Sequence, residues 1–274
     1  MYFIIAGAHF AIIFHNILHY FAHDKDMDFY RELALESAKT ASALSDRREK
    51  KMSRRVRLAS FRAEQAFGPE GEERENGEYH TLLINGNLPE ISDLSEEVSK
   101  DIAEVLSPLL KGRRHLLVVG LGNPKMVVDA LGSETVAALP TGDLCGRYLS
   151  ALTPSVFGVT GLESASVVRG VVKETSPDLV LAVDTLATRK ADRLFRAVQI
   201  GNVGISPGGG VGNRRESLSR GTLGVPVISL GVPLLAHADL CSSLPAGLVV
   251  TPKEIDILVP AFARCLATGI EWAL

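Results

Sequence analysis

The chain has 274 residues, of which 46% are hydrophobic and 22% charged, and its formal net charge is −3. This length allows one large α/β domain or two small ones with a substantial core, and the slightly negative charge argues against a dedicated nucleic-acid-binding domain, since these are usually basic. Three widely spaced cysteines, Cys145, Cys241 and Cys265, form neither a zinc-binding pattern nor a disulfide framework, which fits a reducing compartment.

The first 26 residues differ in composition from the rest of the chain. Residues 1–22 carry almost no charge and are rich in Phe and Ile, with four histidines in or just after the stretch. The segment lacks the positive n-region and the small-residue cleavage site of a secretory signal. Two interpretations remain, a membrane anchor and a mis-assigned start with Met27 as the true initiator, and we favour the second. Residues 27–274 are expected to form a single α/β domain.

Residues 27–67 are predicted to be helical and strongly charged. The basic cluster Asp46–Arg57 within them is interpreted as the solvated face of a helix, with a contact site for an acidic partner as the alternative. A polar, turn-rich linker over residues 68–77 leads to a short strand, Tyr79–Ile84. Apolar residues at helical spacing then predict a helix over Ser92–Leu110.

From residue 116 onward the pattern is that of an α/β protein. The expected buried strands, each a short apolar run, are Leu116–Val119, Leu179–Val183 and Val225–Leu230. The expected helices are Val127–Ala138, Ser166–Thr175, Lys190–Ala197 and Pro252–Ala273, the last with Thr251 as N-cap and Glu254 three residues on. Strands that alternate with helices predict a three-layer, doubly wound and mostly parallel sheet.

Two aspartates follow apolar strands, and they are the candidate catalytic residues. Asp184 ends the run LVLAVD, where a carboxylate costs several kcal/mol unless it is paired or protonated. Asp129 follows the strand at residue 116 after a glycine-containing turn, and a helix cap is its alternative role. Ligands bind beyond the carboxyl ends of parallel strands. Two carboxylates delivered there can share a proton and activate a water, which is the chemistry of a hydrolase.

Two glycine-containing segments are candidate binding elements. The turn Gly120–Pro124 lacks the third glycine of a dinucleotide fingerprint, so a nucleotide site is weakly indicated, and the turn is expected to position Asn123 and Asp129. The loop over residues 201–215 is predicted to bind substrate or to act as a lid, with Asn213, Arg214 and Arg215 available to hold a carbonyl or carboxylate; a structural loop is the alternative.

His237 and Asp239 follow the strand at Val225–Leu230 and are expected at the same edge of the sheet. They could supply a base or a ligand, although a satisfied loop pair is the commoner outcome. Ser155 and Ser206 lack a nucleophile-elbow context, which argues against a serine hydrolase.

Six segments, in this order, resemble the germination protease family of spore-forming bacteria, and the resemblance extends from Asp28 to the C-terminus. They are GLGNPKMVVDALGSETV, SVFGVTGLES, PDLVLAVDTLATR, ISPGGGVGNRR, TLGVPVISLGVP and VTPKEID. The resemblance implies an endopeptidase that begins the degradation of small acid-soluble spore proteins during germination. It also implies a fold similar to that of hydrogenase-maturation proteases, a zymogen with a short N-terminal propeptide, a homotetramer and a location in the cytoplasm of the spore core.

The family's two essential aspartates map onto Asp129 and Asp184, so the resemblance implies a water-activating carboxylate pair with no cofactor, no direct nucleic-acid contact and no membrane. The chain departs from the family pattern at Thr141–Leu144, where an Arg-His pair is usual, and at Cys241–Gly247, where a longer insertion is usual. These departures keep one alternative open, a catalytically inactive or regulatory relative. The implied similarity in fold to hydrogenase-maturation proteases keeps a second one open, a metal-assisted maturation protease in which His237 would be a ligand.

Overall fold

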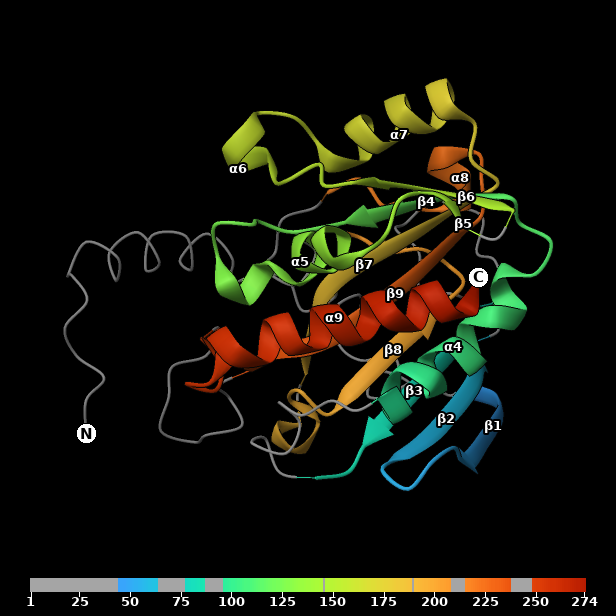
Figure 1. Ribbon diagram of the computed structural model, residues 1–274. Helices are drawn as coiled ribbons and strands as arrows, with labels where there is room; N and C mark the ends of the chain where they lie inside the picture. Colours follow the sequence, from blue (N-terminus) through green and yellow to red (C-terminus); the bar gives the residue numbers. More distant parts are fainter. Residues whose placement is uncertain are drawn as a thin grey trace, which may run out of the picture.

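The computed structural model of the chain describes residues 44–63, 77–86, 96–144, 146–188, 190–207, 215–237 and 248–274 (Figure 1). The strands are β1 (Leu44–Lys51), β2 (Val56–Ala63), β3 (Gly77–Ile84), β4 (His115–Gly120), β5 (Gly142–Leu144), β6 (Arg147–Leu152), β7 (Leu179–Thr188), β8 (Ala197–Gly201), β9 (Val227–His237) and β10 (Val249–Val250). The helices are α4 (Glu96–Leu110), α5 (Leu131–Ala138), α6 (Phe157–Thr160), α7 (Ser164–Thr175), α8 (Arg220–Leu223) and α9 (Ile255–Ala273), with 3₁₀ turns η2 (Val127–Asp129) and η3 (Ala191–Arg193). The apolar first 26 residues and the linker after β2 lie outside the described ranges.

The described strands form one ten-stranded sheet in the order β1-β2-β3-β8-β9-β7-β4-β6-β5, with β10 beside β9. The neighbours β9–β7, β7–β4 and β4–β6 are parallel. The remaining pairs are antiparallel. The predicted α/β class is therefore confirmed. The parallel part is confined to four central strands, because β8 and the β1–β3 meander extend the sheet with antiparallel pairing that the sequence pattern does not indicate.

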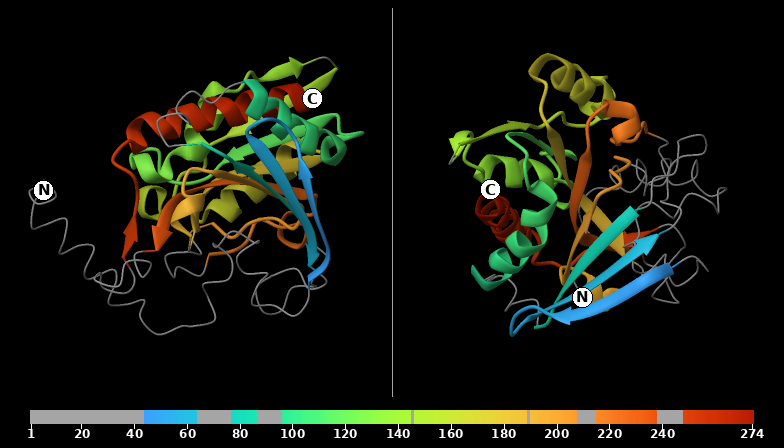
Figure 2. Two further views of the ribbon diagram at one scale, coloured as in Figure 1. Left: turned by 90° about the horizontal axis from the view of Figure 1, so that it is seen from below. Right: turned by 90° about the vertical axis from the view of Figure 1, so that its right-hand side faces the viewer.

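Helices cover both faces of the parallel strands, which gives the predicted three layers (Figure 2). Along β4, Leu116 and Val118 pack into the core under α4, α5 and α9. Leu117 and Val119 pack on the opposite face into the smaller core under α7. Because side chains alternate across a strand and both faces are buried, β4 and the first half of β7 are continuously apolar, and the sequence predicts both. The predicted strand stops at Asp184, whereas β7 continues through it to Thr188 by pairing with β9.

The helix expected over residues 27–67 is wrong where the structure describes it, because residues 44–63 form the hairpin β1–β2. The buried face of this hairpin includes Phe61, which stacks on Tyr79 of β3 with ring centroids 5.3 Å apart. The basic cluster Asp46–Arg57 is therefore not a helix face. It covers most of β1, whose outer edge is unpaired within the described sheet, and the turn that follows it. That turn is fixed by Ser53, whose hydroxyl donates to Asp101 of α4 at 2.5 Å.

Smaller differences occur where a strand replaces an expected helix end. The helix expected over Lys190–Ala197 is only the single turn η3, because the chain enters β8 at Ala197 and pairs with β3 and β9. The expected N-cap at Thr251 is also wrong, since α9 begins after Glu254 and no described side chain caps it.

Among the described helices, none combines the length and the apolar character needed to span a bilayer.

The start of α5 rests directly on the backbone of the parallel strands. A Cβ atom on Gly120 would lie 2.2 Å from the carbonyl oxygen of Gly132, and one on Gly132 would lie 2.6 Å from the carbonyl oxygen of Val183. Real Cβ atoms do not approach backbone atoms this closely, so only glycine fits at both positions. This contact holds the first turn of α5 against the carboxyl end of β4 and the middle of β7.

Replacing Gly132 with alanine should destabilise the protein by about 3 kcal/mol or more, because the new methyl group meets backbone atoms that cannot rotate away. Gly170 is the matched control, since it is exposed in α7 and a methyl group there would have no described atom within 4 Å. Gly170→Ala should stabilise by about 0.5–1 kcal/mol through helix propensity. Urea unfolding of both variants measures the difference, and equal effects would show that α5 does not rest on the strands as described.

His80 of β3 should make stability depend on pH. Burial lowers the pKa of His80 below its ordinary value of 6.5, the Glu78 carboxylate opposes the shift, and Ser60 Oγ lies 2.8 Å from Nδ1. The folded protein then binds fewer protons than the unfolded chain, so stability is lost as the pH falls through about 6.5. His80→Asn preserves a polar partner for Ser60 but does not titrate. Its free energy of unfolding should fall less than that of the parent between about pH 7 and pH 5; parallel curves would contradict this.

Candidate active site

Asp129 is held against the turn that leaves β4. Leu121 continues the pairing of β4 with β7 by donating its N–H to Val183 O at 2.8 Å. Gly122 then adopts φ of 98°, and the N–H of Asn123 donates to Asp129 Oδ2 at 2.8 Å. A Cβ atom on Gly122 would lie 2.9 Å from Asp129 Oδ1. The carboxylate of Asp129 therefore lies on the backbone of residues 122–123, and glycine leaves the room for it.

Asp184 lies inside β7, past its pairing with β4, and only 9% of it is exposed. Val180 and Ala182 pack in the core under α7, so the alternation of the strand places Asp184 on that same face. Its Oδ1 accepts the N–H of Thr185 at 2.8 Å. Burying a carboxylate costs several kcal/mol unless hydrogen bonds or partners compensate, so a carboxylate at this depth needs a structural or chemical reason.

The sheet register brings the two aspartates to the same place. Val183 pairs with Gly120, so the next residues on the two strands, Asp184 and Leu121, are neighbours. Asp129 lies over the two residues that follow Leu121, and η2, which ends at Asp129, packs against β7. Both aspartates thus lie beside the turn that leaves the carboxyl end of β4, Asp129 within the connection that follows it and Asp184 in the middle of β7. The region beyond the carboxyl ends of parallel strands is where α/β proteins bind ligands, and a carboxylate there is a candidate for activating a water.

The structure describes only some of the other predicted binding residues. The side-chain oxygen of Asn123 accepts the N–H of Lys125 at 3.0 Å, so this acceptor serves the turn itself. Asn213 and Arg214 lie outside the described residues. His237 ends β9 and pairs through its backbone with Val249, whereas Asp239 lies outside the described ranges. Among the described residues, no three His, Cys, Asp or Glu side chains come together as a metal site.

Arg215 reaches the carboxyl edge of the sheet from the end of the glycine-rich loop. Its Nη1 donates to Glu163 Oε1, and its guanidinium lies 4.8 Å from the centre of the Phe157 ring. Phe157 begins α6 and Glu163 precedes α7, so both follow the carboxyl end of β6. Sequence reasoning selects Arg215 but misses these two partners. The signal was available, because an acid and an aromatic both lie in the segment SVFGVTGLES.

Large apolar side chains remain exposed around this edge. They follow the carboxyl ends of β4 and β6 or begin α9, and each is 40–58% exposed; they are Met126, Val127, Phe157, Val159, Leu162 and Ile257. Apolar side chains that surround polar groups are typical of a site that takes an organic ligand or a peptide.

Ser155, at the same carboxyl edge of the sheet, has a strained backbone conformation. It follows β6 and has φ of 62°, a value that residues other than glycine rarely adopt. Its carbonyl oxygen accepts the Ser164 hydroxyl at 2.8 Å, whereas its own Oγ is buried without a hydrogen-bond partner among the described residues. Such strain is found most often at functional sites.

Sequence comparisons with known proteins agree on one family. A family profile described as "Germination protease" matches residues 28–244. A germination protease of Caldanaerobacter subterraneus is 37% identical across 80% of this chain and 83% of its own length. One from Clostridium tetani is 32% identical across 72% of this chain and 78% of its own length. The Bacillus subtilis protein is 39% identical across 72% of this chain and 55% of its own length. A [NiFe] hydrogenase maturation protease from Thermococcus kodakarensis aligns in structure with a TM-score of 0.40 and 20% identity, covering 62% of this chain and 98% of that one.

Replacing Ser155 with glycine should stabilise the protein by about 1 kcal/mol or more, because glycine adopts positive φ without strain and the buried hydroxyl is removed. Ser176 is the matched control, since its φ is 49° and it lies exposed at the end of α7. Ser176→Gly should gain about 1 kcal/mol from the backbone alone. Thermal and urea unfolding measure both variants. If Ser155→Gly lowers the stability while Ser176→Gly raises it, the Ser155 hydroxyl has a partner in the folded protein.

Proposed function

The chain belongs to the germination protease family, and we propose that it is an endopeptidase that begins the degradation of small acid-soluble spore proteins, with Asp129 and Asp184 activating the attacking water. The observation that carries this proposal is that both aspartates lie beside the turn at residues 121–123, which leaves the carboxyl end of β4 next to the middle of β7. The family membership supports the peptidase activity, and the geometry supports the choice of residues.

In the proposed mechanism the two carboxylates share one proton. The ionised partner removes a proton from water as the oxygen attacks the scissile carbonyl carbon, and the protonated partner donates a hydrogen bond to the carbonyl oxygen. When the tetrahedral intermediate collapses, a carboxyl group gives a proton to the leaving amine. Since each step needs one ionised and one neutral carboxyl group, we expect a bell-shaped dependence of kcat/KM on pH that belongs to the pair.

The surroundings of the pair suit a peptide substrate. Exposed apolar side chains such as Met126 and Phe157 can contact substrate side chains on either side of the scissile bond. Arg215 lies at the same edge, and a guanidinium can donate to the carbonyl or carboxylate groups of an extended peptide. Asn123, Asn213 and Arg214 are proposed as further contacts to the substrate.

Family membership also supports finer proposals. We infer that the protein is made as a zymogen with an N-terminal propeptide, that it assembles as a homotetramer and that it acts in the cytoplasm of the spore core. Residues 27–274 are proposed to form the protease domain, with residues 1–26 as an apolar extension. Size-exclusion chromatography with light scattering tests the assembly, and mass spectrometry of the N-terminus tests the processing.

The purified chain should cleave a small acid-soluble spore protein, and Asp129→Asn and Asp184→Asn should each lower kcat/KM by about a thousandfold or more, because an amide cannot exchange the shared proton. Asp192→Asn is the matched control, since Asp192 is an exposed carboxylate in η3, eight residues along the chain from Asp184. It should cleave like the parent, and a chelator should have no effect. Product masses report the cleavage.

Two outcomes would contradict the proposal. A folded parent chain that leaves the spore protein intact, with its N-terminus already processed, would indicate the inactive relative. Cleavage that a chelator abolishes and zinc or nickel restores would indicate the metal-assisted alternative instead.

A further inference from the structure

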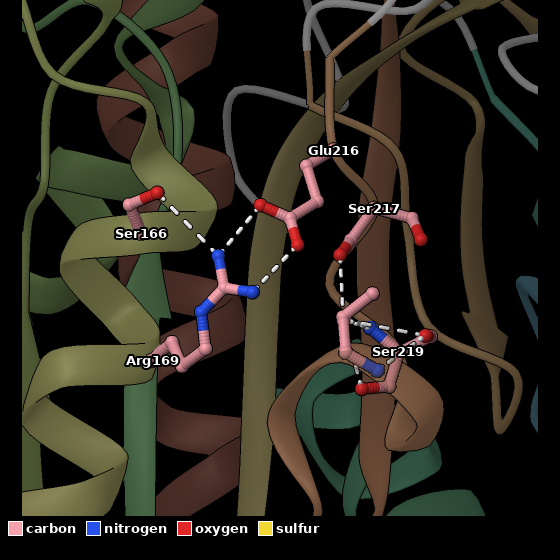
Figure 3. Close-up of polar contacts among 6 residues, drawn as sticks. Ser166, Arg169, Glu216, Ser217 and Ser219 are labelled. Carbon is pink, nitrogen blue, oxygen red and sulfur yellow. Dashed lines mark hydrogen bonds and ion pairs between the residues drawn. The ribbon is translucent and has the colours of Figure 1, made fainter.

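Residues 215–219, which start at the last residue of the glycine-rich loop, lie beside α7. Two ion pairs connect this segment with α7 and with the residue just before it. Arg215 pairs with Glu163 at the start of the helix. The next residue, Glu216, pairs with Arg169, six residues further along the chain. Figure 3 shows the second pair, in which both carboxylate oxygens of Glu216 accept from Arg169 at 2.7 and 2.6 Å. Adjacent residues of opposite charge thus meet opposite charges on one helix.

The same segment is anchored again before β9. Leu218 exchanges backbone hydrogen bonds with Ile205 at 2.7 and 3.0 Å. Ser219 and Thr222 form a capping box at the start of α8, and Thr222 Oγ1 also donates to the carbonyl oxygen of Ser217 at 2.7 Å. The C-terminal half of the segment is therefore fixed by backbone and hydroxyl contacts. Its N-terminal half, which carries the Arg215 guanidinium, is fixed by the two ion pairs.

The Arg169–Glu216 pair has the geometry of a positioning contact. Its side chains are 44% and 36% exposed, and exposed ion pairs contribute little to stability. A bidentate guanidinium–carboxylate pair, however, fixes direction as well as distance. The hydrogen bonds from Arg169 also hold the pKa of Glu216 below its ordinary value, so the pair stays charged at neutral pH. The Arg169–Glu216 pair thus adds little stability, but it fixes the backbone next to Arg215 and so determines the position of the Arg215 guanidinium.

The position of Arg215 matters because its guanidinium can donate more hydrogen bonds than its contact with Glu163 needs. Of its five N–H groups, the bond to Glu163 uses one on Nη1. Stacking on Phe157 at 4.8 Å keeps the guanidinium plane at the carboxyl edge of the sheet. Its other N–H groups can orient a substrate carbonyl or carboxylate only while the backbone at residues 215–216 stays where it is.

We infer that Arg169 and Glu216 are positioning residues for peptide binding: their ion pair holds the Arg215 guanidinium between Glu163 and Phe157, where it orients the substrate chain. This inference rests on the proposed peptidase function. The contact acts on binding of the peptide and leaves the water-activating step to the aspartates.

The test compares three forms with the parent protein. Arg169→Gln removes the ion pair, and the double variant Arg169→Glu with Glu216→Arg restores it with reversed polarity. Lys50→Gln is the control, because Lys50 and Glu104 form another exposed ion pair, at 2.8 Å between distant elements, away from the carboxyl edge. Cleavage kinetics on a small acid-soluble spore protein give KM and kcat, and hydrogen exchange reports the backbone amides of residues 215–219.

In Arg169→Gln, KM should rise about tenfold, the loss of one charge-assisted hydrogen bond to substrate, while kcat changes by less than about twofold. Exchange at Arg215 and Glu216 should quicken by about tenfold, whereas the melting temperature should move no more than in Lys50→Gln. The charge-swapped double variant should recover KM to within about twofold of the parent, and Lys50→Gln should match the parent in both measurements.

The inference is overturned if Arg169→Gln leaves KM and exchange at residues 215–216 unchanged, or if Lys50→Gln changes them equally. It is also overturned if kcat falls and KM does not. A parent protein that cleaves nothing would refute the proposed function instead. In that case exchange still decides whether Arg169 holds the segment, so the two failures can be told apart.

Discussion

The candidate active site depends on a direct backbone-to-backbone contact between a strand and a helix, with no side chains between them. Gly120 at the end of β4 and Gly132 in the first turn of α5 approach so closely that neither could carry a Cβ atom. This contact sets the length of the connection between strand and helix. Residues 121–130 must leave the sheet, turn and return within a few ångströms, and the 3₁₀ turn η2 is the result. Asp129 is carried back over the strand end by that short path.

The two aspartates reach the end of β4 from opposite faces of the sheet. The large core under α4, α5 and α9 holds one face of β4 and β7, and the smaller core under α7 holds the other. Asp184 belongs to the second face, whereas Asp129 arrives from a segment that packs with α5 and α9 on the first. Neither layer alone positions both aspartates, so their placement depends on the assembly of the whole parallel core.

The sequence predicts some parts of this architecture well for a physical reason. The strands β4 and β7 are buried on both faces, so their apolar runs are unambiguous, and the aspartates stand out against them. The hairpin β1–β2 escapes prediction because its charged residues, such as Arg48, Glu49 and Lys50, favour helices locally, whereas its strand structure comes from pairing with β3. The partners of Arg215 escape it for a similar reason, since Glu163 is 52 residues away along the chain. Periodicity reports local burial and does not report such distant pairing.

The outer strands of the sheet have a consequence for how the folded protein behaves in a crowded solution. One described edge, β5, is three residues long, and the other, β1, presents the exposed side chains of Arg48, Glu49 and Lys50. A short strand offers few backbone groups to a neighbour, and charged side chains on an edge strand oppose pairing with a second copy. Molecules that meet edge to edge therefore gain little by adding strands to one another. The sheet can be wide and largely apolar inside and still resist stacking into fibrils at high protein concentration.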